Sequence, residues 1–142
     1  MFGRRRKVTV DMVSKETRIR SDALSKQINA AAIEVHRRLR PGLMESAYEA
    51  CLCHELSLRG IAFQRQFPIP VEYKGIKLDN GYRIDVLVGD LVILELKAVE
   101  DLEAIHEAQL LTYLKLTNLW LGLLINFNVP LLKQGIRRFV NG

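Results

Sequence analysis

Two apolar segments of strand length, separated by a helical segment, constrain the fold of this chain more than any other feature. Residues 91–99 and 119–127 are almost entirely apolar, which is typical of strands buried on both faces of a sheet. Residues 101–117 between them have the pattern of a helix, with Asn118 at its end. A strand, a helix and a second buried strand form a crossover unit, so we expect parallel strands and a right-handed connection.

The N-terminal half of the chain has the periodicity of two helices. Residues 22–39 carry one apolar stripe at spacings of three and four, made by Leu24, Ile28, Ala31, Val35 and Leu39. Ser21 is the expected N-cap of this helix. A second helix is expected over residues 43–59, with Tyr48, Leu52 and Leu56 facing inward. The short connection between them predicts a helical hairpin or a sharp corner.

The middle of the chain changes to the period of strands. Residues 63–73 contain β formers interrupted by two prolines, which predicts an edge strand. Residues 82–88 alternate apolar and polar side chains, and residues 134–140 can add a further edge strand. The core order is therefore α-α-β-β-β-α-β. We expect an α/β fold of the α+β sandwich kind, with one mixed β-sheet flanked by helices.

Length and composition bound the class of protein. The chain has 142 residues, of which 49% are hydrophobic and 26% charged, enough for one domain with one core. No apolar run approaches the roughly 18 residues of a membrane span. The basic N-terminus also lacks the apolar segment of a secretory signal. We therefore expect no membrane contact and a cytoplasmic location, where the two cysteines stay reduced.

The net charge of +5 resides entirely in the first 20 residues. They hold seven of the 21 Lys and Arg residues but two of the 16 Asp and Glu residues. We therefore divide the chain into a basic N-terminal arm, residues 1–20, and a single domain, residues 21–142. Four successive cations of the arm can contact nucleic-acid phosphates, namely Arg4, Arg5, Arg6 and Lys7. The alternative is a solvated terminus that frays.

Two charged residues interrupt the apolar segment 91–99. Glu95 and Lys97 are two positions apart, so a strand places both side chains on one face. Burying a carboxylate and an ammonium costs several kcal/mol unless they are paired or bind a ligand. One explanation is an ion pair with a structural role, and the other is a functional site.

Asp85 favours the functional site. It lies in the alternating strand 82–88, ten residues before Glu95, and a hairpin can place the two carboxylates opposite each other. Two like charges so close become favourable when a divalent cation lies between them, and carboxylate oxygens suit Mg²⁺ or Mn²⁺. The hairpin must then pair residues whose numbers have an even sum. This register predicts a three-residue loop at residues 89–91 or a bulge nearby.

Polar residues also recur at helical spacing. Glu45, Tyr48 and Glu49 share one face of the second expected helix. His106, Gln109 and Tyr113 form a stripe on the otherwise apolar helix 101–117. For each set the alternative is a structural role, either as a core residue whose polar atoms are hydrogen-bonded or as part of a solvent-facing edge.

The cysteines do not indicate a metal centre. Cys51 and Cys53 are two positions apart on the second expected helix, where their side chains diverge by about 200°. They cannot share a tetrahedral site with His54 while the helix is intact. We expect both to be buried, reduced thiols. His36 is expected on the surface of its helix.

Taken together, these residues resemble the motifs of the PD-(D/E)XK nuclease superfamily. Asp85 is followed by Glu95-Leu96-Lys97, the acidic and lysine elements of the motif. Gln109 and Tyr113 have the Gln-x-x-x-Tyr spacing of the RecB-type branch.

A second motif narrows the resemblance. Residues 42–48 match the G-x-x-E-x-x-Y signature of a family of short bacterial and archaeal proteins placed in this superfamily. The resemblance covers residues 26–141 and implies a restriction-endonuclease-like core. Ile84 precedes Asp85 where the superfamily's name has proline, a position that varies in such folds.

The resemblance implies a metal-dependent nuclease. Asp85, Glu95 and the backbone carbonyl of Leu96 would bind Mg²⁺ (or Mn²⁺), and Glu45 would complete the coordination directly or through water. Lys97 would orient or deprotonate the attacking water, or stabilise charge on the phosphate. Gln109 and Tyr113 would hold Lys97, the substrate or the backbone near the cut.

Several alternatives stay open at this point. DNA is the implied partner, with RNA also open, and the mode of cutting can be that of an endonuclease or an exonuclease. A catalytically silent nucleic-acid-binding or protein-partner module on the same fold is the alternative function. A structural protein with a Glu95–Lys97 ion pair is a third. Edge strands and an apolar excess are compatible with a homodimer.

Overall fold

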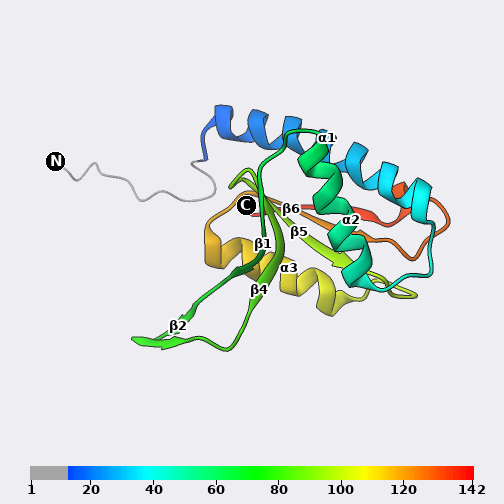
Figure 1. Ribbon diagram of the computed structural model, residues 1–142. Helices are drawn as coiled ribbons and strands as arrows, with labels where there is room; N and C mark the ends of the chain where they lie inside the picture. Colours follow the sequence, from blue (N-terminus) through cyan, green and yellow to red (C-terminus); the bar gives the residue numbers. More distant parts are fainter. Residues whose placement is uncertain (1–12) are drawn as a thin grey trace.

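The computed structural model describes residues 13–142, and Figure 1 shows their arrangement. The N-terminal helix, α1, spans Lys15–Leu39 and is longer than predicted. Its N-cap is Ser14, whose hydroxyl accepts a hydrogen bond from the backbone N–H of Thr17 at 3.0 Å. The prediction of Ser21 as N-cap is wrong, because that side chain is fully buried within the helix.

The start of α1 was missed because residues 15–20 are mostly charged or polar and add nothing to the apolar stripe of the helix. Residues 15–20 of the predicted arm are therefore part of α1. The basic residues predicted to contact phosphates, Arg4, Arg5, Arg6 and Lys7, lie outside the described residues.

Helix α2, Glu45–Leu58, follows α1 after a short loop and packs against it. The Tyr48 hydroxyl donates a hydrogen bond to the carbonyl of Arg40 at 2.6 Å and accepts one from the N–H of Leu43 at 3.1 Å. A buried side chain of α2 therefore holds the loop between the two helices. The residues predicted to face inward are all fully buried: Tyr48, Leu52 and Leu56.

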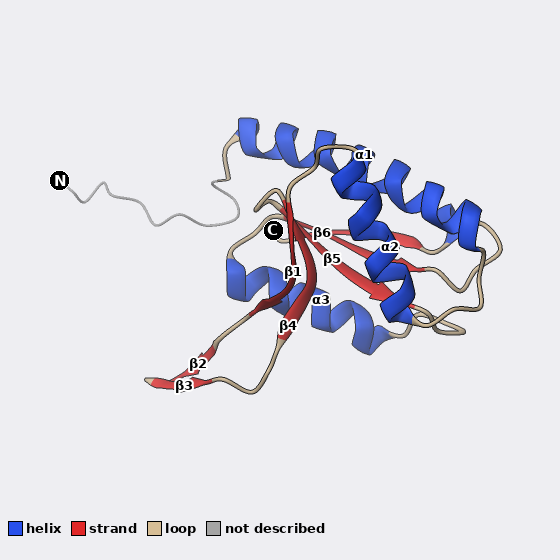
Figure 2. Ribbon diagram, viewed as in Figure 1, coloured by secondary structure: helices blue, strands red, loops and turns tan. Residues whose placement is uncertain are grey.

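A mixed five-stranded sheet forms the centre of the molecule (Figure 2). Its strands lie in the order β1-β4-β5-β6-β7. They are β1 (Phe63–Pro68), β4 (Arg83–Val88), β5 (Val92–Lys97), β6 (Leu121–Asn126) and β7 (Ile136–Val140). Strands β5 and β6 are parallel and the other pairs antiparallel. The predicted central position of β5, its parallel partner and both edge strands are confirmed.

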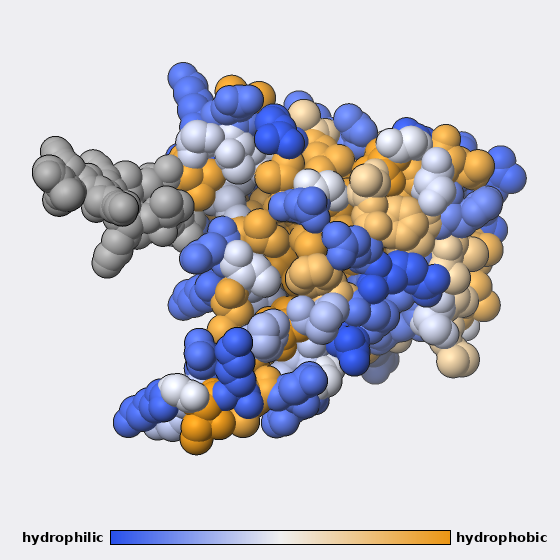
Figure 3. Space-filling view, turned by 60° about the vertical axis from the view of Figure 1, so that its left-hand side comes forward, coloured by the Kyte–Doolittle hydropathy of each residue, from blue (hydrophilic) through white to orange (hydrophobic). Residues whose placement is uncertain are grey.

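The predicted strand over residues 63–73 is wrong in its extent. Strand β1 ends at Pro68, and the chain then forms a separate hairpin from β2 (Val71–Tyr73) and β3 (Ile76–Leu78). Pro68 and Pro70 lack the N–H groups that a continuing ladder needs. The hairpin projects from the sheet in Figure 1, and in Figure 3 it stands out at the lower left with apolar residues on its surface.

Two apolar clusters cover the two faces of the sheet. Helices α1 and α2 pack on one face, where Ile28 and Leu52 belong to the same cluster as Leu94 of β5. Helix α3, Ala104–Thr117, packs on the other face, where Leu110 and Leu114 belong to the same cluster as Ile93. Three helices around this mixed sheet give the predicted α+β sandwich. No helix in residues 13–142 combines the length and apolar character of a membrane span.

The chain approaches itself closely where β6 ends. Gly135 follows the 3₁₀ turn η3, Leu132–Gln134, and its carbonyl accepts a hydrogen bond from the N–H of Asn126 at 2.9 Å. A Cβ atom on Gly135 would lie 2.2 Å from the backbone oxygen of Asn126. Residue 135 can therefore carry no side chain unless the backbone moves.

We expect Gly135→Ala to lower the free energy of unfolding by about 3 kcal/mol, since two backbone segments must separate. Urea denaturation measures the change. The matched control is Gln134→Ala, an exposed neighbour whose replacement should change stability by less than about 0.5 kcal/mol. Equal stabilities of the two variants would contradict the close approach.

Candidate active site

The hairpin between β4 and β5 has the predicted register. Val88 pairs with Val92 and Val86 with Leu94, so three residues, 89–91, form the loop. The N–H of Leu91 donates to the carbonyl of Val88 at 3.0 Å and closes it. The same register sets Asp85 opposite Glu95, which confirms the even-sum pairing.

Asp85 and Glu95 are tied together by hydrogen bonds between side chain and backbone. The backbone N–H of Asp85 donates to Glu95 Oε2 at 3.0 Å. The backbone N–H of Leu96 donates to Asp85 Oδ2 at 2.8 Å. Regular pairing of the two strands ends at Val86, so each carboxylate takes a backbone donor that the ladder no longer uses. The two carboxylates are therefore fixed side by side where β4 begins and β5 ends.

At Asp85 the side chains of strand β4 exchange the faces of the sheet to which they point. Val86 packs in the α1–α2 cluster, whereas Ile84 packs in the α3 cluster, although regular alternation would place both on one face. Across from Asp85 on β1, Gln66 has a φ of 51°, which is uncommon for a residue with a side chain. Such backbone strain persists where the surrounding structure imposes it, and it gathers at functional sites.

Burial raises the pKa of both carboxyl groups. The pKa of Glu95, whose side chain is almost fully buried, rises to about 8 through burial and then through the negative charge of Asp85. The pKa of Asp85 rises mainly through burial, and the carboxylates of Glu49 and Glu45 add to the rise. At neutral pH the pair therefore tends to hold a proton, which a divalent cation can displace.

Lys97 lies at the end of β5, two residues beyond Glu95, and is half-buried. Its positive charge partly offsets the rise in the pKa of both Asp85 and Glu95, so the ammonium lies near both carboxylates. Within residues 13–142 the ion pairs shorter than 4 Å do not include Lys97. The structural Glu95–Lys97 ion pair is therefore not formed.

Asn126 shapes the backbone next to Lys97 and was missed by sequence reasoning. It pairs in register with Lys97 on the parallel strand β6 and is almost fully buried. Its side chain accepts the N–H of Val99 at 3.0 Å and donates to the carbonyl of Val99 at 2.9 Å. This amide fixes the chain as it leaves β5. One asparagine at the end of an apolar run carried no distinctive signal.

Gln109 and Tyr113 lie on α3, which covers the face of the sheet that the alternation of β5 assigns to Glu95. Gln109 Nε2 donates to the Tyr113 hydroxyl at 3.1 Å. Burial raises the pKa of Tyr113, and the negative charge of Glu95 adds to the effect, which places the phenol near that carboxylate. His106 has a local role instead: its Nδ1 accepts the N–H of Glu103 and caps the helix.

The two glutamates of α2 differ in their surroundings. Glu45 is exposed in the first turn, and its charge raises the pKa of both Asp85 and Glu95. Glu49 is buried and accepts hydrogen bonds from Arg65 Nε at 3.1 Å and Gln66 Nε2 at 2.9 Å. Glu49 is thus already satisfied, whereas Glu45 is open to a further partner. Arg65 and Gln66 were not foreseen, because nothing in strand 63–68 marked them.

The donor set at this end of the sheet fits a hard divalent cation. Two carboxylates lie side by side, and hard oxygen ligands of this kind suit Mg²⁺ or Mn²⁺. Among residues 13–142, no group of three His, Cys, Asp or Glu side chains is arranged to hold a metal ion. The structure therefore brings Asp85 and Glu95 together, while Glu45 stands apart from them.

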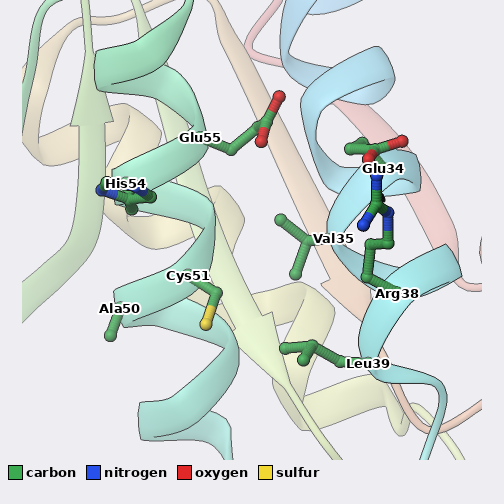
Figure 4. A pocket seen from close by; sticks show the side chains of 8 residues that line it. All are labelled: Glu34, Val35, Arg38, Leu39, Ala50, Cys51, His54 and Glu55. Atoms are coloured by element: carbon green, nitrogen blue, oxygen red, sulfur yellow. Dashed lines mark hydrogen bonds and ion pairs between the residues drawn. The ribbon is translucent and has the colours of Figure 1, made fainter.

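The Cys and His residues lie elsewhere. Cys51 and His54 line a groove of about 430 Å³ between α1 and α2 (Figure 4). Cys51 is exposed, so the prediction that both thiols are buried is wrong for this one. Cys53 is buried, and burial raises the pKa of its thiol to about 11. The prediction for His36 is also wrong: its ring is buried and Nε2 bonds the carbonyl of Val129 at 2.8 Å.

A mixed sheet between helices, with paired acids where β4 begins and β5 ends and a lysine beside them, agrees with the predicted restriction-endonuclease-like core. A family model described as the PD-(D/E)XK nuclease superfamily matches residues 22–139. The chain belongs to this superfamily, as the sequence motifs predicted. Comparisons with curated proteins and with solved structures found no match.

Proposed function

We propose that this protein is a Mg²⁺- or Mn²⁺-dependent nuclease that hydrolyses phosphodiester bonds of DNA, and that it is a G-x-x-E-x-x-Y member of its superfamily. The observation that carries the proposal is the acidic pair of Asp85 and Glu95, cross-linked through backbone N–H groups beside Lys97. Glu95 is almost fully buried, and the ion pairs within residues 13–142 include neither acid, so this pair is costly for a strand with a merely structural role. A location in the cytoplasm and assembly as a homodimer stay predictions.

Each residue of the site has a task in this proposal. Asp85, Glu95 and the backbone carbonyl of Leu96 hold the metal ion, and Glu45 completes its coordination directly or through water. When bound there, a divalent cation would supply Lewis-acid polarisation of the phosphodiester and a water of lowered pKa. Lys97 orients or deprotonates the attacking water, or stabilises negative charge on the phosphate.

The residues on α3 position the reacting groups. Gln109 donates a hydrogen bond to the Tyr113 phenol, and the charge of Glu95 raises the pKa of that phenol, which supports a place for both side chains near the acids. From there the two side chains can hold Lys97 or a substrate phosphate. Because Tyr113 is almost fully buried, its orientation is set by packing and does not wait for the substrate.

Cleavage of labelled single-stranded DNA, duplex DNA and RNA tests the proposal. We expect cleavage of DNA with Mg²⁺ or Mn²⁺ and none with EDTA, because the proposed activity needs a divalent cation held by the acidic pair. Comparison of cleavage of RNA and of DNA shows which of the two nucleic acids is the substrate. If a strand is bound but is cleaved neither with Mg²⁺ nor with Mn²⁺, the proposed activity is rejected. The protein would then be the catalytically silent binding module.

A further inference from the structure

A second groove lies between the C-terminal end of α1 and the segment 130–133. Its volume is about 350 Å³, and its lining includes Arg37, Arg40 and Lys133 together with the buried His36. Ile33 and Leu131 add apolar walls that are largely exposed. No residue of the candidate active site lines this groove.

The groove is positively charged and its cations are available. Arg40 and Lys133 are exposed, and neither forms an ion pair within the described part of the chain. Among residues 13–142, those that line the groove include no acid, and Glu34 of α1 is already paired with Arg37 and Arg38. The groove therefore presents a net positive surface whose natural complement is a chain of phosphates.

The backbone at Arg40 is strained in a way that a glycine would relieve. Its φ of 64° and ψ of 173° fall in a region that is almost confined to glycine. Two hydrogen bonds hold this conformation: Arg40 N–H donates to His36 O at 2.7 Å, and Arg40 O accepts from Tyr48 Oη at 2.6 Å. The fold thus keeps an arginine at a position where the backbone conformation favours glycine. This indicates that the side chain of Arg40 has a function.

Packing connects the groove to the candidate active site. The ring of Tyr48, which holds Arg40, stacks on Phe127 with centroids 4.5 Å apart. The N–H of Phe127 donates to the carbonyl of Lys97 at 2.9 Å. Glu45 lies one turn before Tyr48 on α2. The groove and Lys97 are therefore at the same end of the sheet, joined through two stacked rings.

We propose that this groove binds the phosphate backbone of the nucleic-acid strand at a distance from the cut, with Arg40 and Lys133 as its main contacts. The inference rests on the proposed nuclease function and names the surface that holds the substrate. The exposed apolar walls can pack against sugars, whereas the cations bind phosphates without reading sequence.

Binding of a fluorescein-labelled DNA strand in EDTA, followed by anisotropy over a range of salt concentrations, tests the groove separately from catalysis. We expect Arg40→Gln/Lys133→Gln to weaken binding about tenfold. The slope of log K against log salt should fall by about 1.4 for single strands, about 0.7 for each phosphate that the variant no longer neutralises. The control is Arg20→Gln/Lys26→Gln, which removes two exposed cations from α1 outside the groove. It should leave both quantities nearly unchanged.

A second variant separates the side chain of Arg40 from the stability of the fold. Arg40→Gly should lose affinity while the melting temperature stays equal or rises, because glycine adopts this backbone conformation without strain. Groove variants that bind DNA as tightly as the wild type overturn the inference, whether or not the wild type cleaves. Groove-dependent binding by a wild type that does not cleave overturns the proposed nuclease activity alone.

Discussion

Replacement of Lys97 by alanine is expected to slow DNA cleavage about 10³-fold, while the protein stays folded and keeps its metal affinity. The ammonium lies near both acids, since its charge lowers the pKa of each. It forms no ion pair within residues 13–142, so its removal breaks no such contact in the fold. The rate constant of cleavage in a single turnover, at saturating Mg²⁺, measures the effect.

Two further variants make the result specific. Lys115→Ala removes an exposed lysine from the last turn of α3 and should cleave like the wild type. Lys97→Arg keeps the positive charge, but arginine does not lose a proton in proteins, so it cannot act as a base. Activity retained by the arginine variant assigns Lys97 to charge stabilisation, and activity lost assigns it to proton transfer. Unchanged cleavage by Lys97→Ala rejects the mechanism.

The sheet and its central acids were predictable because their signals are local in sequence. The apolar runs that became β5 and β6 can be buried only at the centre of a sheet, and the intervening helix required them to be parallel. The loop at residues 89–91 followed from arithmetic, since Asp85 and Glu95 can share a site only in an even register. The register of the β4–β5 hairpin was therefore predicted from the requirement that the two carboxylates share a metal site.

Other parts of the site could not be predicted, because they depend on departures from regular structure. The sequence pattern of β4 alternates, yet the strand turns over at Asp85, with Gln66 strained beside it. The buried roles of Asn126 and His36 depend on carbonyls of distant segments. Periodicity describes one element at a time, so it cannot show which carbonyl a side chain will meet.

The acidic pair leads to the second large effect, which is on metal binding. The double variant Asp85→Asn/Glu95→Gln should lose detectable binding of Mg²⁺ and Mn²⁺ in isothermal titration, because amides replace both charged ligands. The matched control is Glu72→Gln/Asp79→Asn, which removes two exposed acids from the β2–β3 hairpin and its loop. If the wild type binds metal only with DNA present, the same comparison is made with the strand added. Equal binding by the two double variants contradicts the proposed site.

Binding should also release protons. At neutral pH Glu95, with a pKa of about 8, is largely protonated in the metal-free protein, and the cation must displace that proton. The heat of binding will therefore depend on the ionisation enthalpy of the buffer, and the affinity will rise with pH until Glu95 is ionised. A heat independent of buffer would contradict a raised pKa for this carboxyl.

The same carboxyl makes the metal-free protein less stable as pH rises. The pKa of Glu95 rises from its ordinary value of 4.5 to about 8 on folding, so between these values the folded state binds more protons than the unfolded chain. Stability must then fall as pH increases across this window. Glu95→Gln removes the charge and keeps an acceptor for the N–H of Asp85, so we expect it to be about 2 kcal/mol more stable than the wild type above pH 8. Mg²⁺ should reduce this difference in the free energy of unfolding, because it binds and stabilises the wild type but not the variant. If Glu95 had a structural role instead, replacing it by a neutral residue would lower the stability of the protein. Thermal melting of the wild type and of Glu95→Gln, with and without metal, therefore distinguishes a metal ligand from a structural acid.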